Sequence, residues 1–372
     1  MKTIRRLIYG EILLAVGFVL LAFLSLFLFF DFVDELTSIG KASVLDPNRI
    51  YGVQQALLFV TLLVPSRIYE LMPIAVLIGC VFVMARLAQS SEYTILRTSG
   101  LGPGRALRTL LLLGTGFVAL TFAMGDYLAP LADRSGQLLK AQYEGRISVG
   151  QRGAWLKERG NGLQRSVNVG ALTPEGEMEN IRIYEFDAEG QLLRNVRAAT
   201  AAFQPDASGW LLGNVQIQRY NMDTEPPQVT QETLPTLAWE STISAEMVSV
   251  ALLSPERMRT VDLFNYINHL QENNQTTQRY EIEFWRKVFY PLSCLVMVVL
   301  ALPFAYLHFR SGGVAGYVFL GVMVGISFFL LNNLFGYVGN LRAWEPVLAA
   351  AAPALLYSVA SLGAFGWLVL RR

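Results

Sequence analysis

Reactive and metal-binding residues are scarce in this chain of 372 residues. It holds two cysteines and two histidines, and 16% of its residues are charged against 53% that are hydrophobic. Cys80 and Cys294 both lie in apolar runs, where a thiol is usually a small buried hydrophobic group, so neither a disulfide framework nor a zinc site is expected. The net charge of +1 excludes a polyanion-binding surface over the whole chain, so nucleic acid is not an expected partner.

The motifs of common catalytic and nucleotide sites are also missing. The sequence contains no H-E-x-x-H, G-x-S-x-G or G-x-x-x-x-G-K-[ST]. The turn Gly100-Leu101-Gly102-Pro103-Gly104 follows a predicted helix rather than a strand, which favours a helix-ending turn over a phosphate loop. An enzyme is therefore not expected, and no cofactor is assigned to this chain. If ATP drives its function, another chain hydrolyses it.

Long apolar runs dominate what is present. A bilayer core of about 30 Å needs roughly 20 apolar residues per helix. Windows of this kind cover residues 12–30, 68–84, 107–124, 288–307, 314–335 and 347–370. The first of them is too long for the apolar part of a cleavable signal and has no A-x-A site after it, so it is interpreted as a span. The pattern predicts a membrane protein with three spans on each side of a polar insert.

Basic residues gather on one side of these spans. That side carries Lys2, Arg5, Arg6, Arg86, Arg97, Arg105, Arg108, Arg310, Arg371 and Arg372, opposed only by Glu11 and Glu92. By the positive-inside rule, both termini are predicted to be cytoplasmic and the insert to lie outside the cytoplasmic membrane. His269 and His308 then fall on opposite sides and cannot share a site.

Two segments next to the second span need interpretation. Residues 56–64 are apolar and end at Pro65, so they form either a surface helix turned at that proline or the start of a long, tilted second span. Residues 85–99 have mixed periodicity and predict a short amphipathic helix on the cytoplasmic side.

The insert, residues 143–261, is typical of β-structure. Residues 181–186 alternate between apolar and polar, Asp187-Ala-Glu-Gly190 predicts a turn, and 192–203 predict the returning strand. Repeated short strands without a helical pattern indicate a sandwich, jelly roll or barrel. The expected domains are 1–142 with three spans and a coupling helix near 85–99, the β-domain 143–261, and 262–372 with a return helix and three spans.

Several short motifs occur in a distinctive order. Phe32-Val-Asp34-Glu-Leu36 closes the first span and Leu71-Met-Pro73 opens the second. Leu87-Ala-Gln-Ser-Ser-Glu92, Ser99-Gly100 and Ala129-Pro130 follow. In this order and topology the whole chain resembles the LptF/LptG family, the permeases of the lipopolysaccharide export system. The first motif resembles the LptG branch more than the LptF branch.

The resemblance implies the partners of such a permease. They are an LptF-like chain in a pseudo-symmetric heterodimer, a dimeric cytoplasmic ABC ATPase, a periplasmic β-jellyroll bridge protein and a single-span regulatory subunit. It also implies that the insert is jellyroll-like, and that the chain extracts lipopolysaccharide from the bacterial inner membrane and passes it to the bridge. The alternative is a mechanotransmission or scaffold subunit that couples the ATPase to a periplasmic partner without moving lipid.

The resemblance also assigns candidate site residues. Glu92, Tyr93, Leu96, Arg97 and Gly100 would contact the ATPase, although Glu92 could instead be a solvated charge on an amphipathic helix. Substrate contacts would come from Lys140, Arg134, Lys41, Phe30, Arg286 and Lys287. For the basic members of this set the alternative is snorkelling at the membrane surface, and for Phe30 it is a lipid-facing or packing surface. The sequence departs from the family at Asp31, where LptG chains often have lysine.

Overall fold

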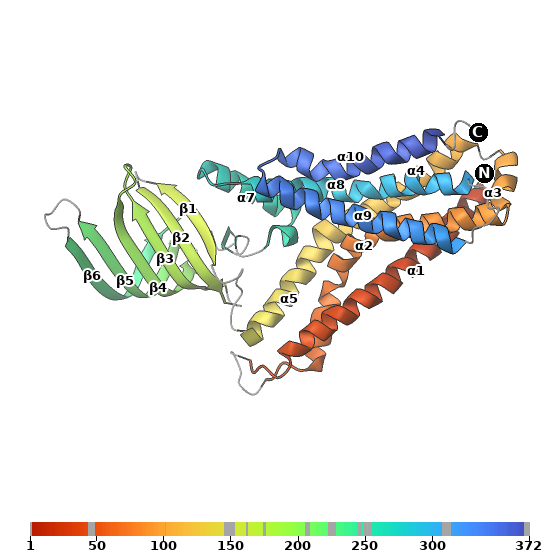
Figure 1. The fold of residues 1–372 in the computed structure, drawn as a ribbon. Helices are drawn as coiled ribbons and strands as arrows, with labels where there is room; N and C mark the ends of the chain where they lie inside the picture. Colours follow the sequence, from red (N-terminus) through yellow and green to blue (C-terminus); the bar gives the residue numbers. More distant parts are fainter. Residues whose placement is uncertain are drawn as a thin grey trace. The chain divides into compact units, whose positions relative to one another are not determined.

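The computed structural model describes residues 2–43, 49–100, 102–144, 153–160, 163–173, 176–204, 209–221, 228–244, 247–248, 251, 254–306 and 314–367. Six of its helices are long and apolar enough to cross a membrane (Figure 1). In the sequence, the six described strands come between the third and the fourth of these helices. The predicted class, a helical membrane protein with an inserted β-domain, is confirmed. The chain forms two compact units, Met1–Asp34 with Val60–Ala132 and Gln278–Arg372, and Glu35–Phe59 with Asp133–Thr277.

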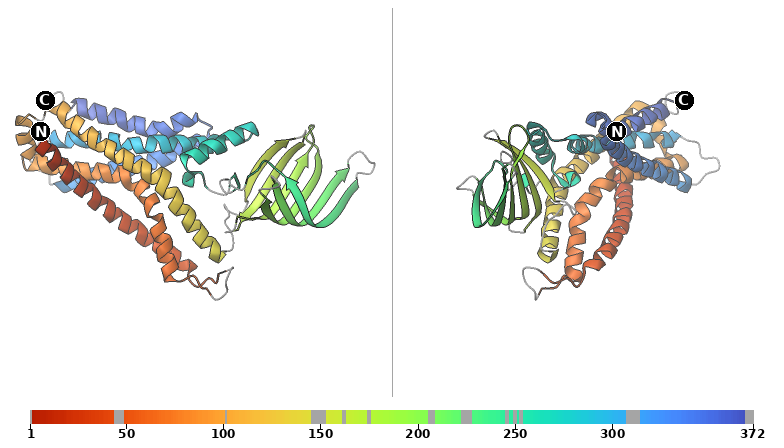
Figure 2. Two further views of the ribbon diagram at one scale, coloured as in Figure 1. Left: turned by 180° about the vertical axis from the view of Figure 1, so that it is seen from behind. Right: turned by 60° about the vertical axis from the view of Figure 1, so that its left-hand side comes forward.

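The first unit is a helical bundle. Its helices are α1 (Lys2–Glu35), α2 (Val53–Gln89), α3 (Glu92–Thr98), α4 (Pro103–Ala123), α8 (Gln278–Ala301), α9 (Val314–Leu341) and α10 (Pro346–Phe365). A π-helical turn, η2 (Met124–Leu128), joins α4 to α5 (Ala129–Glu144), and a 3-10 turn, η6 (Leu302–Tyr306), follows α8. Helix α1 begins and α10 ends at the same end of the bundle (Figure 2).

Helix α2 is the centre of the bundle, and α1 and α9 are peripheral. In the most apolar window of each helix, 83% of α2 is buried, against 17% of α1 and 17% of α9. Helix α1 buries Ile12 and Val16 and leaves Leu14 and Phe18 exposed. Gly79 of α2 permits this contact, because a Cβ at that position would lie 2.8 Å from the Val16 backbone nitrogen. One face of α1 is therefore packed and the other is uncovered in this chain.

The structure decides between the two interpretations of residues 56–64. Helix α2 continues from Val53 through Pro65 and Pro73, so the segment belongs to a long second span rather than to a surface helix. Proline is tolerated inside membrane helices because neighbouring groups can bond the freed carbonyls.

The helix expected over residues 85–99 is divided in two, which corrects that prediction. Helix α2 runs to Gln89, and α3 starts at Glu92 after Ser91, whose φ of 60° is left-handed. The Ser90 hydroxyl donates to the carbonyls of Arg86 and Leu87, so it competes with the helical backbone at this point. Gly100 ends α3 with φ +101°, a conformation that favours glycine.

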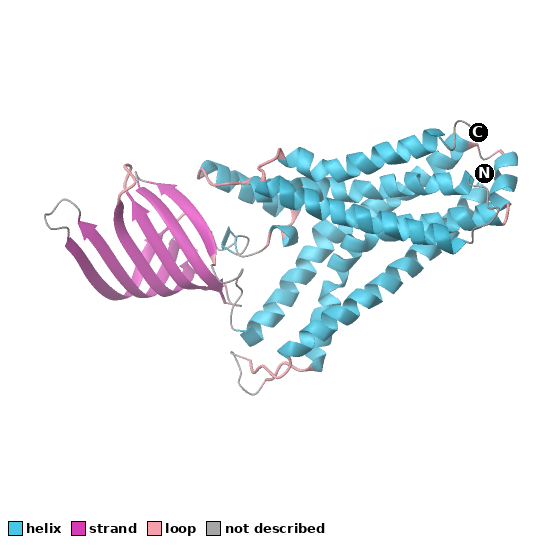
Figure 3. Cartoon of the chain, in the orientation of Figure 1, coloured by secondary structure: helices cyan, strands magenta, loops and turns pink. Residues whose placement is uncertain are grey.

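The second unit contains a single antiparallel sheet. Its strands are β1 (Ala154–Gly160), β2 (Leu163–Leu172), β3 (Met178–Phe186), β4 (Leu192–Gln204), β5 (Gly209–Asn221) and β6 (Gln228–Glu240), and each pairs with the next in sequence (Figure 3). The described strands thus form a curved meander, without the crossovers between two sheets that define a strict jelly roll. The same unit includes η1 (Leu36–Ser38), η5 (Pro255–Arg257) and α7 (Thr260–Glu272).

Register places two different ladders side by side on one face of this sheet. An apolar ladder crosses five strands through Leu156, Val167, Ile183, Val196 and Ile217, all 2% exposed or less.

A charged ladder lies beside it, two residues away from the apolar residue on each of the first four strands. It consists of Glu158, Arg165, Glu185 and Arg194, each directly opposite the next. Because side chains alternate along a strand, both ladders point to the same side of the sheet. The ion pairs therefore lie on the same face of the sheet as the apolar ladder, in the row next to it.

Candidate functional site

Three chain segments meet around a buried carboxylate at the end of α1. The group, called here the Glu35 cluster, contains residues from the end of α1, from η1, from the loop between η1 and α2, and from the end of α5. Its members line one crevice too narrow to admit water: Glu35, Ser38, Lys41, Tyr51, Lys140 and Tyr143. The loop that carries Lys41 is tied back by a bridge between Ala42 and Ile50.

Glu35 is bonded through both carboxylate oxygens. Oε2 lies 3.0 Å from Lys140 Nζ, and Oε1 accepts a hydrogen bond of 2.9 Å from the Tyr51 hydroxyl. Lys140 Nζ also stands 4.5 Å from the centre of the Phe59 ring, and the Tyr51 and Tyr143 rings meet edge to face at 5.0 Å. The structure thus brings the predicted substrate residues Lys140 and Lys41 together, with Glu35 as a partner that the prediction did not include.

Arg134 and Phe30 lie outside this cluster. Arg134 is exposed on α5, six residues before Lys140, and is not on the same face of the helix. Phe30 is 56% exposed on α1 and contacts Phe29 edge to face. Its position suits a surface in contact with lipid or with another chain.

Asp31 is paired within the bundle. Its two oxygens accept hydrogen bonds of 2.6 and 2.9 Å from Arg67 of α2, which also bonds Glu70 and lies over the Phe27 ring. The first span thus carries the carboxylate of this pair and the second span carries the cation.

Arg286 and Lys287 have separate environments on α8. Arg286 bonds Glu283 of its own helix at 2.6 Å and Asn333 of α9 at 3.2 Å. Lys287 is 7% exposed and donates to the Gly125 carbonyl, in the π-helical turn, at 3.1 Å. Both side chains therefore bond other spans of the bundle. As substrate contacts, they would have to bind lipid while they keep these bonds.

Of the residues predicted to contact the ATPase, some are packed against the bundle and others are exposed. Tyr93 is 3% exposed, and its hydroxyl bonds that of Tyr306 in η6 at 3.1 Å, so it fixes α3 to the bundle. Leu96 packs against the same core, and the Arg97 guanidinium lies over the Tyr306 ring. Glu92 is exposed.

Ile95, three residues on and 63% exposed, is the apolar neighbour of Glu92 that the sequence prediction missed. Helical spacing alone could have indicated it, since residues i and i+3 share a face.

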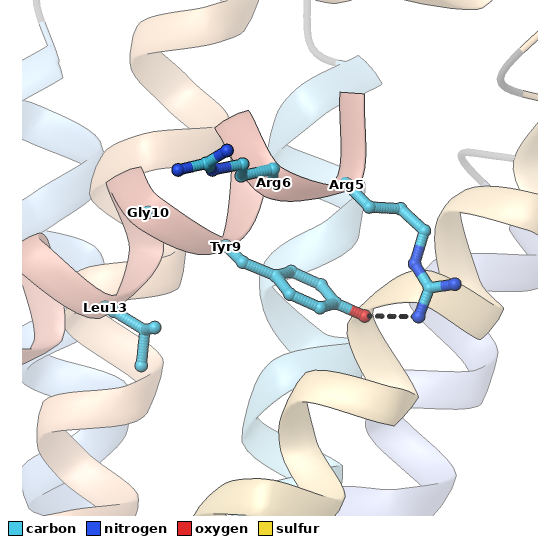
Figure 4. A pocket seen from close by; sticks show the side chains of 5 residues that line it. All are labelled: Arg5, Arg6, Tyr9, Gly10 and Leu13. Carbon is cyan, nitrogen blue, oxygen red and sulfur yellow. Dashed lines mark hydrogen bonds between the residues drawn. The ribbon is translucent and has the colours of Figure 1, made fainter. Parts of the chain in front are cut away.

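A hollow of about 470 Å³ lies beside the first turns of α1. Arg5, Arg6, Tyr9, Gly10 and Leu13 line it (Figure 4). Arg5 reaches the Tyr9 hydroxyl at 3.4 Å, Tyr9 donates to the Thr109 carbonyl of α4 at 2.9 Å, and Arg6 extends away from the ring. These bonds fix the start of α1 on α4. Within the described ranges, no three His, Cys, Asp or Glu residues are placed to hold a metal ion.

The chain is similar to known proteins over nearly its whole length. Residues 6–371 match the family model described as lipopolysaccharide export system permease LptF/LptG. The permease protein LptG of Escherichia coli K12 is 29% identical over 344 residues, which are 92% of this chain and 90% of that protein. LptG of Haemophilus influenzae Rd is 26% identical over 360 residues, 96% of each chain. With its six apolar helices and inserted sheet, this multi-pass inner-membrane chain belongs to the LptF/LptG family of lipopolysaccharide export permeases.

Proposed function

We propose that this chain is the G-type subunit of an ABC transporter that extracts lipopolysaccharide from the inner membrane and passes it to a periplasmic bridge. In this proposal it pairs with an LptF-like chain, and its insert lies in the periplasm with both termini in the cytoplasm. A dimeric ATPase supplies the energy, so no cofactor is needed in this chain. A single-span regulatory subunit completes the complex.

The observation that carries the proposal is the uncovered apolar surface of α1 and α9. Phe18 and Phe30 on α1 are 75% and 56% exposed, and Phe319 and Leu330 on α9 are 66% and 60% exposed. In a membrane such faces contact either lipid or another helical chain. In a heterodimer that encloses acyl chains between these faces, the exposed apolar side chains of both helices would be in contact with lipid or with the partner chain.

The Glu35 cluster is the proposed site for the polar part of the lipid. It is built around Glu35, the last residue of α1, and contains Lys140 and Lys41. A lysine ammonium next to a phosphate forms a charge-assisted hydrogen bond, which is stronger than a neutral one. Lys140 is therefore the proposed phosphate contact, and the exposed Arg134 is expected to contribute less.

Helix α3 is the proposed contact with the ATPase. Glu92 and Ile95 are exposed on it, whereas Tyr93 holds the helix to the bundle through Tyr306. A push on α3 would therefore reach the inner end of α8 through one tyrosine pair. This transmits movement to the spans without a nucleotide site in this chain.

Photocrosslinking in the purified complex tests the proposal. A benzophenone amino acid is placed at Phe18, at Phe319, and at the control position Val359, which is 71% exposed on α10. We expect lipopolysaccharide adducts from the first two positions and few from the control, with the LptF-like chain and the ATPase in the preparation.

The alternative function predicts a different outcome. If the partner chains co-purify but no position crosslinks lipopolysaccharide, the chain is a mechanotransmission or scaffold subunit that does not move lipid. Equal adducts at all three positions would show only that the lipid surrounds the bundle.

A further inference from the structure

Glu35 is an anionic partner of Lys140, as a lipid phosphate would be. The carboxylate is 4% exposed and its Oε2 atom is 3.0 Å from the ammonium, so the two charges largely cancel in this conformation. Lys140 is also held by the Phe59 ring beneath it. A phosphate that approaches this ammonium therefore finds an anion already in contact with it.

The Tyr51 hydroxyl fixes this anion in place. It donates to Glu35 Oε1, and the Tyr51 ring is itself 1% exposed and packed on Tyr143. Rotation of the carboxylate away from Lys140 would break this bond. A bound phosphate must consequently either share Lys140 with Glu35, against the repulsion of two like charges, or displace the carboxylate.

We propose that Glu35 is an internal competitor for the Lys140 ammonium and so sets how tightly the phosphate groups of lipopolysaccharide are held. The inference rests on the proposed function, because it takes Lys140 as the phosphate contact. A permease must release its cargo as well as bind it, and sites that conduct a ligand onward bind it only moderately. Glu35 supplies an anion that reoccupies Lys140 when the lipid leaves.

The test measures lipopolysaccharide binding by the intact transporter complex in nanodiscs. Glu35→Gln removes the charge but keeps an oxygen that can accept from Tyr51. We expect its dissociation constant to fall at least about fivefold, which is the effect of one unit charge at about 4 Å in water and a lower limit for a buried carboxylate. Glu35→Asp keeps the charge and should stay within about twofold of the unmodified chain.

A double-variant comparison shows whether Glu35 acts through Lys140. Lys140→Gln alone should weaken binding, and Glu35→Gln should give no gain when it is added to Lys140→Gln. The gain should also vanish with lipopolysaccharide whose lipid A phosphates have been removed. If Glu35 had a purely structural role, the effect of Glu35→Gln would depend neither on Lys140 nor on the lipid A phosphates. If Glu35→Gln fails to assemble, Glu35→Met, a neutral side chain of similar length, replaces it.

Failure of this inference is distinguishable from failure of the proposed site. If Lys140→Gln weakens binding but neutral Glu35 variants bind no more tightly, Glu35 does not compete and the inference is overturned while the site stands. A gain that persists in the Lys140→Gln background also overturns it, because Glu35 would act through another group. If neither Lys140→Gln nor Glu35→Gln changes binding, the phosphate site itself is wrong.

Discussion

Replacing Glu185 by glutamine should destabilise the inserted sheet by about 2–3 kcal/mol. This carboxylate lies at the centre of the charged ladder, with 4% of its side chain exposed. It accepts bonds from Arg165 Nε at 3.0 Å and from Arg194 Nη2 at 2.8 Å, and a third, short bond from Arg194 Nε. Glutamine keeps the shape but leaves two arginines next to each other without the central negative charge.

The expected size follows from the burial of the three groups. Removal of one partner from a buried ion pair costs about 3–5 kcal/mol. The Arg165 and Arg194 side chains are 19% and 32% exposed, so water can solvate part of the charge that is left. Arg165 also keeps Glu158, at 3.5 Å. Because of this solvation and this remaining contact, the expected loss of stability lies at the lower end of the range of about 3–5 kcal/mol or slightly below it.

Hydrogen exchange in the purified full-length protein is the suitable measurement, because it reports opening of the sheet separately from the helices. A loss of about 2–3 kcal/mol should speed exchange of protected β3 and β4 amides roughly 30- to 150-fold. Glu232→Gln is the matched control. Its pair with Arg219 is 3.7 Å long and more than half exposed on both sides, so it should change exchange very little. Equal effects of the two variants would refute the reasoning.

The same ladder gives the sheet a dependence on pH. Burial alone would raise the pKa of Glu185, but the hydrogen bonds and positive charges of Arg194 and Arg165 outweigh it and hold the pKa below the ordinary value of 4.5. Stability from this group is thus present above pH 4.5 and lost as pH falls through the lowered pKa. Protection of the sheet should decline in that acidic range, and Glu185→Gln should remove part of the decline. An unchanged pH profile in the variant would contradict this assignment.

Three further predictions concern coupling, topology and the bundle. If α3 contacts the ATPase as proposed, Glu92→Lys should abolish ATPase-driven export, since removal of one partner from a buried interfacial charge pair costs about 2–5 kcal/mol; normal export in the variant would remove α3 from the coupling path. Glu189→Cys, in the exposed β3–β4 turn, should react with a membrane-impermeant thiol reagent in cells with a permeabilised outer membrane, because both native cysteines are buried. Labelling only after lysis of the inner membrane would reverse the proposed orientation. Lys287→Met should cost about 1–3 kcal/mol by leaving the Gly125 carbonyl without this donor, seen as a lower melting temperature in detergent; an unchanged melting temperature would show that the bond contributes little.

Sequence patterns determined the class of each part of this protein. Apolar runs of span length fixed the number of membrane helices, because a bilayer demands a minimum length whatever the neighbours are. Alternation in 181–186 and 192–203 around the Asp187–Gly190 turn was sufficient to predict the β3–β4 hairpin, which is confirmed. Ordered motifs such as Phe32-Val-Asp34-Glu-Leu36 were sufficient to identify the family. These signals are local or additive along the chain.

Pairings between distant residues were decided only by the tertiary structure. Glu35 and Lys140 are 105 positions apart, and Tyr93 and Tyr306 are 213 apart, so no local pattern indicates that they meet. The sequence therefore predicted Lys140 as a cation without its counter-charge, and Tyr93 as a docking residue although it is buried.

The path of α2 through Pro65 was likewise set by its surroundings. A proline removes one backbone donor in any context, yet α2 continues through Pro65 and Pro73, because groups that neighbour a membrane helix can bond the freed carbonyls. Local sequence specifies what each segment can form, and packing specifies which side chains are left free to act.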